Sequence, residues 1–132
     1  MRLVSGAREA IQALRAAGLL LAVISNQSGV ARGYITIDDV EAVNRRIDEL
    51  LGPFDAWLYC PHGPGDDCEC RKPLPGMVIE AARLLGVTPA QCAVVGDKQS
   101  DVDAARAAGA EGFPFVSNAS LFDVAQIIIE KC

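Results

Sequence analysis

The regular alternation of short apolar runs with segments of helical periodicity constrains the fold of this sequence most. The run over residues 19–24 is continuously apolar, as expected for a strand that is covered on both faces of a parallel sheet. Further strands are predicted over residues 54–59, 92–95 and 112–116. Because amphipathic segments of about ten to fifteen residues separate these runs, the pattern predicts right-handed βαβ units and an α/β fold with a doubly wound parallel sheet.

The helical segments are bounded by residues that cap or break helices. Thr36 and Asp39 approximate a capping box, and Gly86 and Gly109 stand where helices should stop. Ser100 is expected to cap the fourth helix. Five helices are predicted, over residues 6–17, 36–51, 75–85, 100–109 and from 120 onward. A helix therefore comes first, whereas a doubly wound sheet normally begins with a strand.

Composition limits the number of domains and the classes of partner. With 132 residues, of which 51% are hydrophobic and 22% charged, the chain is expected to form one domain over residues 1–132. A net charge of -5 without a cluster of Lys and Arg argues against nucleic acid as a partner. The longest apolar run is too short to cross a membrane, and no signal peptide is recognisable, so a cytoplasmic protein is expected.

Three of the five cysteines and the only histidine lie within residues 60–70. Three thiolates and an imidazole form a donor set that suits tetrahedral zinc, and a closed set of four is typical of a structural site. The alternative is a group of incidental thiols beside a surface histidine. Cys92, which lies in a predicted strand, is expected to be a small buried hydrophobe. The predicted zinc ligands are Cys60, His62, Cys68 and Cys70.

Polar residues follow the predicted strands, at the edge where ligands bind in a parallel sheet. Ser25 and Asn26 could direct a hydroxyl and an amide at an anion, although such a pair is also ordinary turn chemistry. Arg71 and Lys72 directly follow the cysteine-rich loop, and a metal there would fix both cations where they can hold a phosphate. A solvated basic pair is the alternative.

Two carboxylates follow the strand predicted over residues 92–95. Asp97 and Asp101 offer the hard oxygen ligands that Mg²⁺ prefers, and Lys98 could contact a phosphate. The alternative is that Asp97 caps a turn while Asp101 only favours the N-terminus of a helix.

Three stretches together resemble the haloacid dehalogenase-like phosphatases. They are SNQSGVARGY (residues 25–34), CPH with CECRKP (residues 60–73) and GDKQSD (residues 96–101), in the order of that family. The resemblance is to its zinc-loop branch, whose members act on heptose 1,7-bisphosphate or histidinol phosphate. It covers nearly the whole chain and implies a Rossmann-like fold.

The resemblance also implies roles for the candidate residues. Ser25, with Asn26 beside it, resembles the hydroxyl residue that binds the transferring phosphoryl group. Lys72 resembles the catalytic lysine that steadies an aspartyl-phosphate. Asp97 resembles the Mg²⁺ ligand, with Asp101 in support. The residues that resemble substrate-phosphate contacts are Arg71 and Lys98.

The family's nucleophile and its acid–base residue form an Asp-x-Asp motif after the first strand, and no such motif occurs before Gly6. The chain as given is therefore expected to be inactive, because the remaining groups cannot form the aspartyl-phosphate. In the family that first strand is central, so the expected sheet lacks its central strand and has unpaired edges across a gap. A truncated or misassigned version of a longer enzyme is expected, or a chain that exchanges a strand with a second copy.

Two functions remain open. In the first, the full-length parent is a Mg²⁺-dependent phosphatase that acts on a small phosphorylated sugar, heptose 1,7-bisphosphate before histidinol phosphate. In the second, the chain is a pseudoenzyme that binds zinc and phosphate without turnover.

Overall fold

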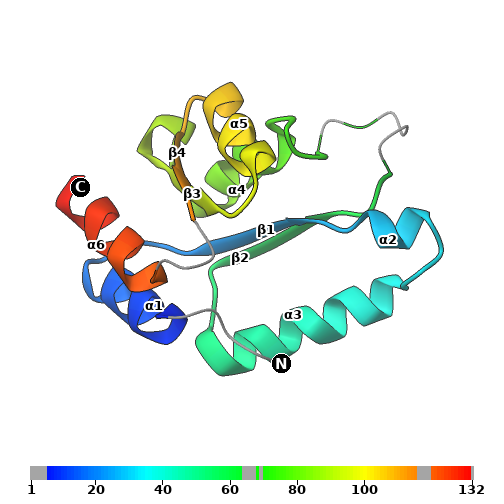
Figure 1. Ribbon diagram of the computed structural model, residues 1–132, viewed down its shortest axis with the longest axis horizontal. Coiled ribbons are helices and arrows are strands. Elements are labelled where there is room, and N and C mark those ends of the chain that lie inside the picture. Colours follow the sequence, from blue (N-terminus) through cyan, green and yellow to red (C-terminus); the bar gives the residue numbers. More distant parts are fainter. Residues whose placement is uncertain (1–5, 64–67, 69, 116–119, 132) are drawn as a thin grey trace.

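The computed structural model describes residues 6–63, 68, 70–115 and 120–131. Helices and strands alternate along the chain (Figure 1). The elements are α1 (Ala7–Ala16), β1 (Ala22–Asn26), α2 (Ser28–Ala31), α3 (Ile37–Leu51), β2 (Ala56–Cys60), α4 (Gly76–Leu85), the 3₁₀-helix η1 (Pro89–Gln91), β3 (Ala93–Gly96), α5 (Gln99–Ala108), β4 (Glu111–Pro114) and α6 (Leu121–Lys131). In this part of the chain, no helix has the length and apolar character needed to cross a membrane.

All four strands of the described chain pair in parallel, which confirms the predicted α/β class. In the first pair, Ala22 of β1 lies opposite Ala56 of β2, and the register continues to Asn26 opposite Cys60. In the second pair, β3 lies beside β4. The helices α3 and α5 connect the strands within each pair, as parallel pairing requires.

The two pairs form separate two-stranded sheets within the described residues. β1 and β3 each hydrogen-bond to one neighbouring strand there. The expected absence of a central strand between them stays a prediction.

Helices α4 and α5 join the two sheets through a shared apolar core. α4 contacts β1, β2 and α5, while α5 contacts β3 and β4. Ile24 of β1 and Val94 of β3 pack against the same cluster. The buried members of this cluster are Val78, Ala104, Ala105 and Ala110. Figure 1 shows α3 on the other side of the β1–β2 pair and α1 beside α6, a helix pair in close contact.

The first strand begins and ends later than the sequence predicts. The apolar run was expected to be a strand from residue 19, but Leu20 is 53% exposed and β1 begins at Ala22. Ser25 and Asn26, predicted as loop residues, are the last two residues of β1, and the short helix α2 follows. Every residue of β1 is only partly buried, because β1 pairs with a strand on one side only within the described chain.

The predicted capping signals are correct at three of the helix ends. Thr36 Oγ1 accepts the Asp39 N–H at 3.1 Å, and Asp39 Oδ2 accepts the Thr36 N–H at 2.9 Å, which completes the capping box of α3. Gly86 and Gly109 end α4 and α5 with φ of 74° and 88°, values that favour glycine. Ser100, however, is not the cap of α5: Lys98 is the N-cap residue, and Ser100 lies in the first turn.

Cys92 is the predicted buried residue that the structure places differently. It lies just before β3, and its side chain is partly exposed while it packs against the apolar core. Its thiol donates to the Thr88 carbonyl at 3.4 Å. The expected strand at residues 112–116 is shorter in its described part, since β4 ends at Pro114 and residues 116–119 lie outside the described chain.

Candidate functional site

The four predicted zinc ligands lie together directly after β2. Their donor atoms all lie within 4.8 Å of one another. Cys60 is the last residue of β2 and is fully buried, so the strand fixes the first ligand. The other three ligands come from the segment that follows, of which residues 64–67 and 69 lie outside the described chain. The sequence prediction that these four side chains meet is therefore confirmed.

Three of the distances between the donor atoms are near those of a tetrahedral metal site, and a fourth is too short. With metal–sulfur bonds of about 2.3 Å, the sulfur atoms of a tetrahedral site lie about 3.8 Å apart, and a sulfur and a nitrogen lie roughly 3.5 Å apart. Cys60 Sγ is 3.8 Å from Cys68 Sγ. His62 Nδ1 is 3.3 Å from both Cys60 Sγ and Cys70 Sγ. The Cys60–Cys70 sulfur distance of 2.6 Å is shorter and would have to open by about 1 Å around an ion.

Two of these thiols have environments that move their pKa in opposite directions. The backbone N–H of Arg71 is the main cause that lowers the pKa of the Cys68 thiol. Burial is the main cause that raises the pKa of the Cys70 thiol to about 12, and the hydrogen bonds with Cys60 and Cys68 add to it. Crowded thiols cannot all ionise at once without a cation among them, and a bound metal ion would supply that positive charge.

Lys72 is held at both ends. Its backbone N–H donates to Asn26 Oδ1 at 3.0 Å, and its backbone carbonyl accepts from Asn26 Nδ2 at 3.3 Å. Its Nζ forms an ion pair with Asp101 Oδ1. The side chains of Lys72 and Asp101 are only 12% and 8% exposed, so water screens this pair weakly.

Asp101 uses its second carboxylate oxygen as well. Oδ2 accepts the backbone N–H of Lys98 at 3.1 Å, which satisfies a free donor at the start of α5. Gly96, the last residue of β3, leaves the space that this side chain occupies, since a Cβ on Gly96 would lie 2.2 Å from Asp101 Oδ2. The carboxylate therefore binds Lys72 and the helix start rather than pointing freely into solvent.

The side chains of the other predicted site residues have different environments and do not all face the Lys72–Asp101 pair. Asp97 and Lys98 are exposed between β3 and α5. Arg71 Nη1 donates to the His62 carbonyl at 3.4 Å, so its guanidinium contacts the metal loop. Ser25 Oγ accepts from Gln27 Nε2 at 3.2 Å, and Ser25 projects to the face of β1 opposite to Asn26 because side chains alternate along a strand.

Two features of this site were not predicted from the sequence. The amide of Asn26 binds the backbone of Lys72, a contact across 46 positions that no local pattern encodes. Position 96 needs a glycine because Asp101 leaves no space for a Cβ there. The φ of Gly96 does not lie in the left-handed region and makes no such demand. The one sign in the sequence of the close contact between Gly96 and Asp101 is that Gly96 directly precedes Asp97, the first of the two carboxylates.

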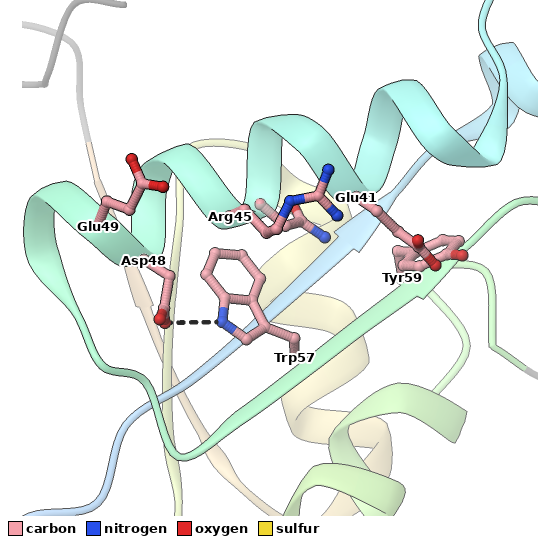
Figure 2. A pocket seen from close by; sticks show the side chains of 7 residues that line it. Glu41, Arg45, Asp48, Glu49, Trp57 and Tyr59 are labelled. Atoms are coloured by element: carbon pink, nitrogen blue, oxygen red, sulfur yellow. Dashed lines mark hydrogen bonds between the residues drawn. The ribbon is translucent and has the colours of Figure 1, made fainter.

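A separate groove of about 520 Å³ lies between α3 and β2 (Figure 2). Asp48 accepts the indole N–H of Trp57 there at 3.1 Å, and Arg45 and Glu41 lie above the two aromatic rings. Trp57 and Tyr59 alternate along β2 with Leu58 and Cys60, so they face away from the cysteine cluster. The groove and the Lys72–Asp101 pair are thus on opposite faces of the first sheet.

Comparison with known proteins identifies the family. The sequence pattern of the haloacid dehalogenase-like hydrolases matches residues 2–109. The chain belongs to this family. Its match with a D-glycero-beta-D-manno-heptose-1,7-bisphosphate 7-phosphatase of Pseudomonas aeruginosa is 46% identical over 103 residues, which are 75% of this chain and 58% of that relative. The matching region thus spans less than two thirds of that protein.

A second relative and two solved structures of this family agree with that assignment. The Rhodopseudomonas palustris protein of the same description is 42% identical and matches over 98% of this chain and 78% of its own length. A crystal structure of the Bordetella bronchiseptica heptose bisphosphate phosphatase, complexed with magnesium and phosphate, superposes with a TM-score of 0.84 at 32% identity, over 96% of this chain and 83% of that chain. A putative phosphatase of the same family from Mesorhizobium loti gives 0.73, also at 32% identity, over 93% and 71%.

Proposed function

We propose that this chain is part of a Mg²⁺-dependent phosphatase that removes a phosphate from a small phosphorylated sugar. The observation that supports this most is the buried pairing of Lys72 with Asp101, which places a fixed cation beside the carboxyl ends of the strands. The relatives at 46% and 42% identity are phosphatases of heptose 1,7-bisphosphate, and this is the substrate we propose.

The residues of this chain would bind and orient the phosphate. Lys72 would stabilise the negative charge that develops on the phosphoryl group, because a fixed cation in a poorly hydrated site interacts strongly with an anion. Arg71, Lys98 and the hydroxyl of Ser25 are proposed to contact substrate oxygens. Ser25 lies on the face of β1 opposite to Asn26. Its hydroxyl would therefore contact the phosphate from that face, or after a change in its orientation.

Magnesium would be held at the end of β3. Asp97 offers an exposed carboxylate there, and Mg²⁺ needs only one or two carboxylates together with water and phosphate oxygens. The ion would neutralise charge on the phosphate. Asp101 is already engaged by Lys72 and Lys98, so its proposed support for the ion is indirect.

Zinc is proposed to hold the loop that precedes Lys72. The donor set of three thiols and one imidazole suits Zn²⁺ in a closed structural site, and the Cys60–Cys68 and Cys60–His62 distances support it. Lys72 lies two positions after Cys70, so an ion there would restrain the backbone that carries the catalytic cation.

Phosphate release separates the candidate functions. The test compares release by this chain alone with release by the chain joined to an upstream segment that carries an Asp-x-Asp motif, and we expect turnover in the joined chain because that motif supplies the nucleophile of an aspartyl-phosphate. Heptose 1,7-bisphosphate should then be hydrolysed in preference to histidinol phosphate, the nearest alternative substrate. Equal absence of release in the joined and unjoined chains would favour the pseudoenzyme that binds zinc and phosphate.

We further propose that residues 1–132 form one domain in which β1 and β3, each paired with one strand only among the described residues, allow strand exchange between copies. The separate pairing of β1–β2 and β3–β4 in the described chain supports this proposal. Sedimentation should show a dimer that dissociates on dilution. A stable monomer with one cooperative unfolding transition would contradict it.

A further inference from the structure

Asn26 directs its side chain at the backbone of Lys72 and contacts it twice. The amide oxygen accepts the Lys72 N–H at 3.0 Å, and the amide nitrogen donates to the Lys72 carbonyl at 3.3 Å. The side-chain amide thus offers one acceptor and one donor to the Lys72 backbone, as the backbone of a neighbouring strand would. Both polar atoms of the Asn26 side chain are therefore engaged with Lys72.

The pairing of β1 with β2 holds the backbone from which Asn26 makes this contact. Asn26 ends β1 opposite Cys60 of β2, and the next residue, Gln27, donates its N–H to the Cys60 carbonyl at 2.7 Å. The backbone of Asn26 is thus held by the same strand that carries the first cysteine of the metal cluster. A side chain fixed in this way can set the position of the residue that it binds.

The two hydrogen bonds and the ion pair together determine where the Lys72 ammonium lies. Asn26 holds the backbone, while Asp101 holds Nζ. Without the Asn26 side chain, the Lys72 backbone would lose both of these hydrogen bonds and could shift. The ion pair with Asp101 would then hold Nζ alone. We propose that Asn26 is a positioning residue that acts on phosphate through Lys72, instead of a direct substrate contact. This inference rests on the proposed function in assigning phosphate binding to Lys72.

A double-mutant cycle tests whether Asn26 acts through Lys72. Inorganic phosphate is titrated into the full chain and into Asn26→Ala, Lys72→Met and the double variant, with affinity measured by calorimetry. Lys72→Met keeps the backbone groups that Asn26 binds, so Asn26→Ala breaks the same two hydrogen bonds in both backgrounds. We expect Asn26→Ala to weaken binding about tenfold in the wild-type background and to have no further effect beside Lys72→Met.

A second readout does not depend on phosphate binding. Brief acetylation followed by mass spectrometry measures how fast the Lys72 amine reacts, and its burial and ion pair should make it slow in the wild type. Asn26→Ala should accelerate this reaction severalfold. Asn44→Ala, at a partly buried asparagine of α3, is the matched control and should leave both the labelling rate and the phosphate affinity unchanged.

The outcomes separate this inference from the proposed function. Additive losses of affinity in the cycle would mean that Asn26 contacts phosphate itself, and a wild-type rate of Lys72 labelling in Asn26→Ala would mean that it does not position Lys72; either result overturns the inference. If the wild type binds no phosphate while Asn26→Ala still accelerates labelling, the positioning role stands and the proposed phosphate site is wrong.

Discussion

Gly96 and Asp101 lie so close together that a Cβ on Gly96 would stand 2.2 Å from the Cβ of Asp101. The end of β3 thus leaves the space into which the first turn of α5 places its buried carboxylate. The same carboxylate pairs with Lys72, which belongs to the segment after β2. A single missing side chain therefore permits the contact that links the two strand pairs at the candidate site.

Gly96→Ala should destabilise the chain by about 1–3 kcal/mol, because the added methyl group forces Asp101 or the strand to move. Chemical denaturation measures the change. Ala93→Ser, at an exposed position of the same strand, is the control and should change the free energy of unfolding little. An unchanged midpoint in Gly96→Ala would show that Asp101 does not need this space.

Asp101→Ala should destabilise the chain by roughly 3–5 kcal/mol, since it leaves the Lys72 ammonium poorly hydrated and without its partner. The double variant Lys72→Met/Asp101→Ala should recover part of that loss, because no unpaired charge remains. Denaturant titrations of the two variants and of Lys72→Met alone provide the comparison. A double variant as unstable as the sum of the single ones would mean that the pair is not coupled.

The purified chain should contain about one zinc ion, as measured by elemental analysis. Cys68→Ser should lower both the zinc content and the melting temperature, because it removes one ligand of a closed set. Cys92→Ser is the matched control, since Cys92 lies outside the cluster. A metal-free protein with an unchanged melting temperature would exclude the structural zinc site.

Asp48 should make the stability of the chain depend on acidic pH. The Phe54 N–H lowers the pKa of the Asp48 carboxyl below its ordinary value, and the Trp57 indole N–H adds to the shift. A lowered pKa in the folded state favours folding above the unfolded pKa of about 3.9, and this contribution is lost as the pH falls through the folded value.

Melting temperatures between pH 6 and about pH 3 measure this contribution. Asp48→Asn should lower the melting temperature near neutral pH and give a shallower decline on acidification than the wild type. Glu41→Gln, at an exposed carboxylate of the same helix, should keep the wild-type slope. Parallel curves for wild type and Asp48→Asn would show that this carboxylate does not contribute.

The sequence was sufficient for features that local spacing encodes. The capping box of Thr36 and Asp39 and the four clustered metal ligands all involve residues close in sequence, and the structure has both. The helix-ending glycines Gly86 and Gly109 are of the same kind.

Features that depend on distant contacts were not predictable in this way. The contact of Asn26 with Lys72 and the ion pair of Lys72 with Asp101 join residues 46 and 29 positions apart. Ser25 and Asn26 were assigned to a loop, where both could face one anion; as strand residues they project to opposite faces. The pairing of β1 with β2 and of β3 with β4 depends on which strand edges lie side by side, and the hydrophobic runs in the sequence do not specify these neighbours.

The division of the four described strands into two ladders has a consequence for the electric field at the candidate site. Lys72 follows one ladder and Asp101 follows the other, so their ion pair joins the two ladders. No backbone hydrogen bond between strands fixes the separation of the two ladders in the described chain. The separation is instead set by the packing of α4 and α5 and by the ion pair itself, so a core substitution far from the site that shifts this packing should change how much of the lysine charge attracts an anion.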